Sequence, residues 1–137
     1  LDSLKKMKDH GVWLEITNLI VPTYSDSAEM ITSMCKWLVD NGFEDTPLHF
    51  SRFFPAHQLP NLPPTPIKTL LAAREIAQTA GMKYVYVENV PTLGYENTVC
   101  PSCQKLLIER TGFTVKKNFI NDGKCAFCHA DIPGDWK

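Results

Sequence analysis

Before residue 95, short apolar runs alternate with longer segments whose apolar residues have helical spacing. The apolar runs are rich in β-branched and aromatic residues, which is typical of strands. The predicted strands are 12–21, 47–54 and 83–87. The predicted helices are 1–10, 27–41 and 65–80, and each is followed by a glycine that can adopt the left-handed conformation of a helix end. The pattern therefore predicts the order α-β-α-β-α-β.

Two of the predicted helices have recognisable start signals and apolar stripes. Ser25 and Asp26 can cap the second helix, and Thr65 followed by Pro66 is a typical start for the third. The apolar stripe of the second helix is expected at Met30, Met34, Trp37 and Leu38, and that of the third at Ile67, Leu70, Ala73, Ala77 and Ala80. Both stripes are expected to face a sheet.

Whole helices between successive strands indicate parallel strands joined by right-handed crossovers. Three strands cannot close a barrel, but they can form part of one. We therefore predict an α/β fold over residues 1–94, a partial parallel (β/α) barrel, followed by a different module over residues 95–137. The first residue, Leu1, lies inside a helical pattern, so we expect the chain to be a piece of a longer protein.

The tail contains two CxxC pairs with 21 residues between them, Cys100–Cys103 and Cys125–Cys128. Two such turns can bring four thiolates to one ion in the tetrahedral arrangement that suits zinc. We predict a zinc ribbon whose short strands are Leu106–Ile108 and Phe113–Val115. A single iron ion or an iron–sulfur cluster fits the same ligands, whereas disulfides or free thiols are disfavoured. His129 follows Cys128 and is expected to be a surface residue beside the site or, alternatively, a substitute ligand.

A closed four-cysteine site leaves no position for a substrate, so its expected role is structural. A segment of roughly 40 residues has too small a core to fold alone without such a metal. The fifth cysteine, Cys35, lies in a helical apolar stretch and is predicted to be a buried small hydrophobe.

Composition and charge narrow the possible function. Hydrophobic residues make up 44% of the chain, which is enough for a real core. The net charge of -1 offers no electrostatic attraction for nucleic acid or an anionic membrane. No apolar run approaches the roughly 20 residues that span a bilayer, and the start has no signal-peptide pattern. We expect a soluble, cytoplasmic protein.

Four phrases in this order carry a family resemblance: WLEITNLIVPTYSDS, PLHFSRFFPAHQL, TPIKTLLAAREIAQTAGMKYVYVEN and CPSC…CAFC. Together they closely resemble the C-terminal half of radical S-adenosylmethionine (radical SAM) proteins of the pyruvate formate-lyase activating enzyme type. The nearest match is the branch called AmmeMemoRadiSam system radical SAM protein, which has this cysteine-rich tail. The resemblance covers nearly the whole chain.

The resemblance implies that the parent protein is a radical SAM oxidoreductase or activase, with S-adenosylmethionine and a [4Fe–4S] cluster as cofactors. The family's CxxxCxxC loop is absent from these 137 residues, and the glycine-rich segment that holds the methionine end of the cofactor is missing. The chain alone should therefore be inactive. Its implied partner is the missing N-terminal half of the barrel, and its implied substrate is a protein.

The resemblance also places a few residues. The strand that contains Thr17 and Leu19 matches a family strand whose inward side chains approach S-adenosylmethionine. Thr17 and Leu19 share one face of this strand, which we expect to be the inward one. The alternative for Leu19 is ordinary core packing. His57, in the phrase FFPAH, is expected near the cofactor or the substrate radical, as a catalytic and cofactor-binding residue; the alternative is a surface histidine. Asn89 is a candidate at the barrel rim or an ordinary turn residue.

The strand predicted at 47–54, within the second phrase, contains two further candidates. Arg52 is a candidate ion-pair partner in the barrel mouth or a solvated edge residue, and His49 is expected to be a satisfied core or face histidine. A rival function belongs to another class: a non-catalytic module in which an α/β unit displays a zinc ribbon to a protein partner.

Overall fold

The computed structural model describes residues 1–90 and 94–136. Its first part is built on a three-stranded sheet of β1 (Ile16–Ile20), β2 (Leu48–Arg52) and β3 (Val85–Glu88). The strands lie in the order β1-β2-β3, and both neighbouring pairs are parallel. The prediction of a parallel α/β unit is therefore confirmed.

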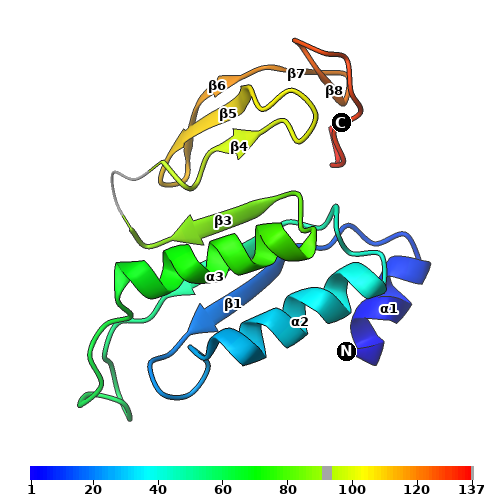
Figure 1. Ribbon diagram of the computed structural model, residues 1–137. Helices are drawn as coiled ribbons and strands as arrows, with labels where there is room; N and C mark the ends of the chain where they lie inside the picture. Colours follow the sequence, from blue (N-terminus) through cyan, green and yellow to red (C-terminus); the bar gives the residue numbers. More distant parts are fainter. Residues whose placement is uncertain (91–93, 137) are drawn as a thin grey trace.

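Three helices accompany this sheet: α1 (Asp2–Asp9), α2 (Ala28–Asp40) and α3 (Ile67–Ala80). The two longer helices, α2 and α3, contact each other and lie on the same side of the sheet (Figure 1). One core of buried apolar residues joins these helices to the sheet; its largest members include Phe50, Ile20, Leu38, Leu70 and Val87. On β1 the alternate residues Thr17 and Leu19 are exposed, so they face away from this core.

The strand β1 begins later than the apolar run predicts. Its first residue, Ile16, donates its backbone N–H to the Pro47 carbonyl oxygen at 2.9 Å, beside the start of β2. Residues 12–15 precede this pairing, and two apolar residues among them, Val12 and Trp13, are exposed. The predicted strand is therefore too long at its start, because residues 12–15 have apolar character but no neighbouring strand among the described residues with which to pair.

The apolar stripe predicted on α2 is partly wrong. The buried residues are Ile31, Cys35 and Leu38, whereas the side chain of Met30 is 54% exposed. Spacings of four and three residues put the buried set on one helical face. The capping residue is Ser27, whose side chain accepts a hydrogen bond from the Met30 N–H at 3.1 Å.

The role predicted for Thr65 is also wrong. Pro66 is the N-cap residue of α3, and the buried Thr65 hydroxyl is engaged with the sheet. It accepts a hydrogen bond from the Phe53 N–H at 2.9 Å and donates one to the Ile20 carbonyl oxygen at 2.5 Å. Thr65 therefore joins the ends of β1 and β2. The end of α3 agrees with the prediction, because Gly81 adopts the left-handed conformation there.

Short antiparallel strands make up the tail. The first sheet has the order β4 (Thr98–Val99), β5 (Leu106–Thr111), β6 (Thr114–Asn118), and a second pairs β7 (Ile120–Asn121) with β8 (Lys124–Cys125). The predicted ribbon strands fall in the hairpin of β5 and β6. In Figure 1 this ribbon lies beyond β3, on the side away from β1.

No helix in the described parts of the chain is long and apolar enough to cross a membrane.

Candidate metal centre

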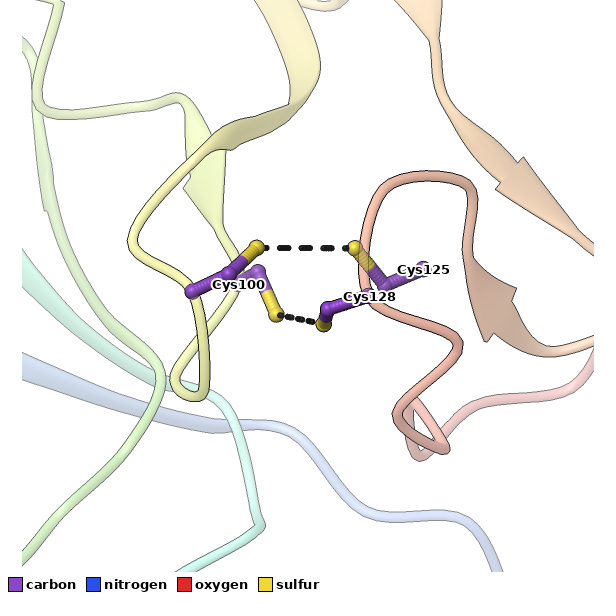
Figure 2. Close-up of side chains that lie close together, drawn as sticks. Cys100, Cys125 and Cys128 are labelled. Carbon is purple, nitrogen blue, oxygen red and sulfur yellow. Dashed lines mark hydrogen bonds between the residues drawn. The ribbon is translucent and has the colours of Figure 1, made fainter.

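The four tail cysteines converge, as their spacing predicts. Cys100 and Cys103 belong to the turn between β4 and β5, while Cys125 ends β8 and Cys128 follows it. All four Sγ atoms lie within 4.8 Å of one another. Figure 2 shows the two turns facing each other across this cluster. The structure thus contains a four-sulfur site that could hold a metal ion.

The sulfur–sulfur distances fit a shared ion better than covalent bonds. Cys100 Sγ and Cys128 Sγ are 3.7 Å apart, and Cys103 Sγ and Cys125 Sγ are 3.8 Å apart. Sulfurs arranged tetrahedrally at about 2.3 Å from a zinc ion lie about 3.8 Å from one another. A disulfide would require about 2.05 Å. These distances therefore leave room for one ion at the centre of the four sulfurs.

The two cysteine turns have the same backbone geometry. In each, the N–H of the residue after the second cysteine donates to the carbonyl oxygen of the first cysteine, from Gln104 to Cys100 and from His129 to Cys125, both at 2.9 Å. In both turns that residue has φ of +60°. The two turns are therefore copies of one structural unit, although they share little sequence beyond CxxC.

Outer hydrogen bonds extend this correspondence. The N–H of Cys100 donates to the Lys105 carbonyl oxygen, and that of Cys125 to the Ala130 carbonyl oxygen, again at 2.9 Å in both turns. In each turn the first cysteine thus both accepts and donates a backbone bond across the turn. This pairing fixes where the two thiols of each turn point.

The environment of the thiols favours a bound cation. Burial raises the pKa of Cys125, but hydrogen bonds from the backbone N–H groups of Phe127 and Cys128 outweigh it and bring that pKa to about 7. A backbone hydrogen bond from Ala130 lowers the pKa of Cys128, yet desolvation and the neighbouring sulfurs raise it to about 12. The thiol of Cys125 therefore loses its proton more easily than an ordinary cysteine, whereas the thiol of Cys128 keeps its proton. A divalent cation at the centre would replace the protons that the sulfurs share and hold all four as thiolates.

The cysteines also make up a large share of the ribbon's interior. Cys100 and Cys125 are fully buried and pack with four apolar residues, Leu107, Ile108, Ile120 and Ile132. Such a small core stabilises little on its own, so we expect the fold of the ribbon to depend on a metal bound by these cysteines. The site's outer edge is Cys128, which is exposed, and the adjacent His129 is exposed as well. The cluster comprises the four cysteines, and His129 is not among its members.

The other predicted site residues lie away from the cysteines. Thr17 and Leu19 are on the face of β1 opposite the helices, and Leu19 is 49% exposed. His57 is exposed, with φ of +47°, in the loop that follows β2. Asn89 follows β3 with φ of +60° and lines a cavity between the sheet and the ribbon. The structure does not place His57 among the described residues that line this cavity.

Of the residues that line this cavity, the sequence singles out Asn89 as a site residue but not His49. The prediction for His49 is a satisfied core or face histidine; in the structure it lines the cavity together with Tyr86, Glu88 and Arg110. The available signal was the alternation of His49 and Ser51 on one predicted strand and the position of Tyr86 on the next, with Glu88 just beyond its predicted end. In parallel strands these polar residues share one face, opposite the apolar one.

Comparison with known proteins identifies a similar archaeal sequence. The chain is 48% identical over 134 residues to an uncharacterized protein of Methanocaldococcus jannaschii. That match covers 96% of the chain but only 40% of the relative's length. No family model matches the chain, and no solved structure matches it significantly.

Proposed function

We propose that these residues form the C-terminal part of a radical SAM enzyme related to pyruvate formate-lyase activating enzyme. The observation that carries the proposal is the two-sided character of the parallel sheet. One face is covered by α2 and α3, whereas the other presents Thr17, His49, Ser51 and Glu88. A barrel wall has this organisation, with helices outside and functional side chains on the inner face.

The family resemblance of the four sequence phrases gives this wall its chemistry. In such an enzyme a reduced [4Fe–4S] cluster cleaves S-adenosylmethionine, and the resulting 5′-deoxyadenosyl radical takes a hydrogen atom from the substrate. The missing half of the barrel would supply the cluster. Thr17, Leu19 and Asn89 would contact the cofactor, and His57 would lie near the cofactor or the radical. The substrate class implied by the resemblance is a protein.

The ribbon has a separate role in this proposal. Zinc bound by Cys100, Cys103, Cys125 and Cys128 would hold the two turns together without taking part in the reaction. Hydrogen bonds then attach the ribbon to the sheet: Tyr86 Oη and Thr98 Oγ1 are 3.0 Å apart, and the Val87 N–H donates to the Tyr95 carbonyl oxygen at 3.2 Å. The site would thereby stabilise the edge of the barrel wall formed by β3.

The test compares this chain with the longer protein encoded by the full reading frame. Both are reconstituted anaerobically with iron and sulfide, reduced, and assayed for 5′-deoxyadenosine. We expect product only from a longer protein that contains CxxxCxxC, and less product after His57→Ala than after the control His10→Ala. An upstream sequence without CxxxCxxC, or a reconstituted long protein that makes no product, would contradict the proposal. So would product from the present chain alone.

One observation favours the rival function, a zinc-ribbon module that binds a protein. Phe113 at the turn between β5 and β6 is fully exposed, and Val115 on β6 is 52% exposed. Exposed aromatic and aliphatic side chains of this kind are typical of contact surfaces. If the long protein lacks activity, loss of partner binding in Phe113→Ser would support this second function.

A further inference from the structure

A cavity of about 780 Å³ lies between the open face of the parallel sheet and the hairpin of β5 and β6. From the sheet it is lined by His49, Tyr86 and Glu88, and from the segment before β1 by Glu15. Arg110 lines it from the hairpin. The four-cysteine site is not part of this cavity. What distinguishes the cavity is the way in which it holds one histidine.

The His49 ring is fixed on two sides. Its Nδ1 is 2.8 Å from Glu88 Oε1, and the other oxygen of Glu88 accepts a hydrogen bond from the Ser51 hydroxyl at 2.8 Å. The ring also stacks on Tyr86, with 4.8 Å between the ring centroids. Because a carboxylate can only accept, Nδ1 carries the hydrogen that it donates to Glu88.

The second ring nitrogen has no such partner. His49 Nε2 is buried and makes no hydrogen bond within the described residues. The atom that faces it is Glu15 Oε2, at 3.5 Å. In the neutral imidazole, with the hydrogen on Nδ1, Nε2 presents a lone pair toward a carboxylate oxygen. Two lone-pair donors that face each other are a pair of ligands for a cation.

We propose that His49 Nε2 and Glu15 Oε2 bind a divalent transition-metal ion at the edge of this cavity. Two ligands at about 2.1 Å from a tetrahedral ion lie about 3.4 Å apart, close to the separation observed here. The partner of Nδ1 also fits, because a histidine that binds a metal typically donates its other N–H to a carboxylate. Glu88 takes this role, and Ser51 orients Glu88 in turn.

This second site differs from the cysteine site in kind. Nitrogen and oxygen ligands suit zinc, cobalt or nickel, and two protein ligands leave positions for water or for a ligand bound in the cavity. The side chain of Glu15 is 57% exposed, so it can move aside to admit an ion. The site should therefore bind metal exchangeably and more weakly than the four thiolates. It does not depend on the proposed enzymatic function.

The experiment titrates Co²⁺ into the chain already loaded with one equivalent of zinc. Cobalt does not displace zinc from the thiolates, because it binds such sites more weakly. We expect one Co²⁺ per chain by calorimetry at concentrations up to about 1 mM, with weak visible absorption that lacks sulfur charge transfer. The NMR signals of the His49 ring should broaden.

Matched variants identify the ligands. His49→Gln and Glu15→Gln should abolish the binding of Co²⁺, and Glu88→Gln should raise its Kd about 10–100-fold because the ring loses its orienting carboxylate. Two control variants should bind Co²⁺ normally. His57→Gln changes a histidine outside the cavity lining, and Glu96→Gln changes another carboxylate of that lining.

Three outcomes would overturn the proposal: no binding of Co²⁺ by the zinc-loaded chain, binding that persists in His49→Gln, or an unchanged Kd in Glu88→Gln. Circular dichroism reports whether each variant folds. Because Glu15 is exposed, Glu15→Gln tests the ligand set even if His49→Gln does not fold.

Discussion

The Thr65 hydroxyl donates a hydrogen bond to the carbonyl oxygen of Ile20, which lies 45 positions earlier in the chain. The same hydroxyl accepts from the Phe53 N–H at 2.9 Å, and the Thr65 carbonyl oxygen accepts from Arg52 Nε at 2.9 Å. One fully buried side chain therefore connects the carboxyl ends of β1 and β2 to the start of α3.

Thr65→Val should destabilise the α/β unit. Valine keeps the shape of threonine but leaves the Phe53 N–H and the Ile20 carbonyl oxygen buried without this partner. Each unsatisfied group costs about 1–3 kcal/mol, so we expect the free energy of unfolding to fall by about 2–4 kcal/mol. Urea unfolding measures this change. Thr65→Ser keeps the hydroxyl and should lose much less; equal losses in the two variants would show that the methyl group, not the hydroxyl, matters.

Cys100→Ser should release the metal and unfold the ribbon while the α/β unit stays folded. We expect about one zinc per chain in the unchanged protein, by elemental analysis, and a loss of binding in the variant, because a hydroxyl is a poor replacement for a thiolate. NMR spectra should show loss of dispersion confined to residues of the ribbon. Cys35→Ala is the matched control, since Cys35 is buried among the helices and should leave the zinc content unchanged.

His129→Gly should stabilise the ribbon and leave zinc binding intact. His129 has φ of +60°, a left-handed conformation that costs an ordinary residue about 1–2 kcal/mol, whereas glycine adopts it freely. The greater conformational entropy that glycine loses on folding offsets part of this benefit. We therefore expect the free energy of unfolding of the zinc-loaded protein to rise by about 1 kcal/mol or less, measured by thermal unfolding. Loss of zinc in this variant would instead identify His129 as a ligand.

Local patterns in the sequence predict much of this structure. The helix ends at Gly11, Gly42 and Gly81 follow from the need for a left-handed residue, and all three glycines have positive φ. The cysteine cluster follows from spacing alone, because CxxC turns have one common geometry. These features depend on a few neighbouring residues, so a single sequence suffices to predict them.

The features that sequence reasoning missed depend on contacts between distant segments. The way α2 packs on the sheet decides whether Met30 or the adjacent Ile31 is buried. Apolar spacing alone does not distinguish these two neighbouring positions. The local sequence around Thr65 fits a helix cap, but its hydroxyl bonds the distant Ile20 carbonyl oxygen instead. Nothing in the neighbouring residues distinguishes these two roles. His49 gains its importance only when β3 brings Glu88 beside it and the chain before β1 brings Glu15.

The buried thiol of Cys35 should make the stability of the α/β unit depend on pH. Burial raises its pKa from 9.0 to about 11 in the folded protein, so the folded state keeps the thiol protonated where the unfolded chain ionises it. The stabilisation is therefore complete below pH 9 and is lost as the pH rises from 9 toward 11. Cys35→Ala, which has no group to ionise, escapes this loss.

Urea unfolding of both proteins between pH 7 and pH 11 tests this prediction. At neutral pH the alanine variant should be less stable by about 1–2 kcal/mol, because it leaves a small cavity. That difference should shrink above pH 9. The control is Leu70→Ala, which also removes a buried side chain of the same core but no titratable group, so its deficit should stay constant. A constant deficit for Cys35→Ala as well would mean that burial does not raise the pKa of the thiol.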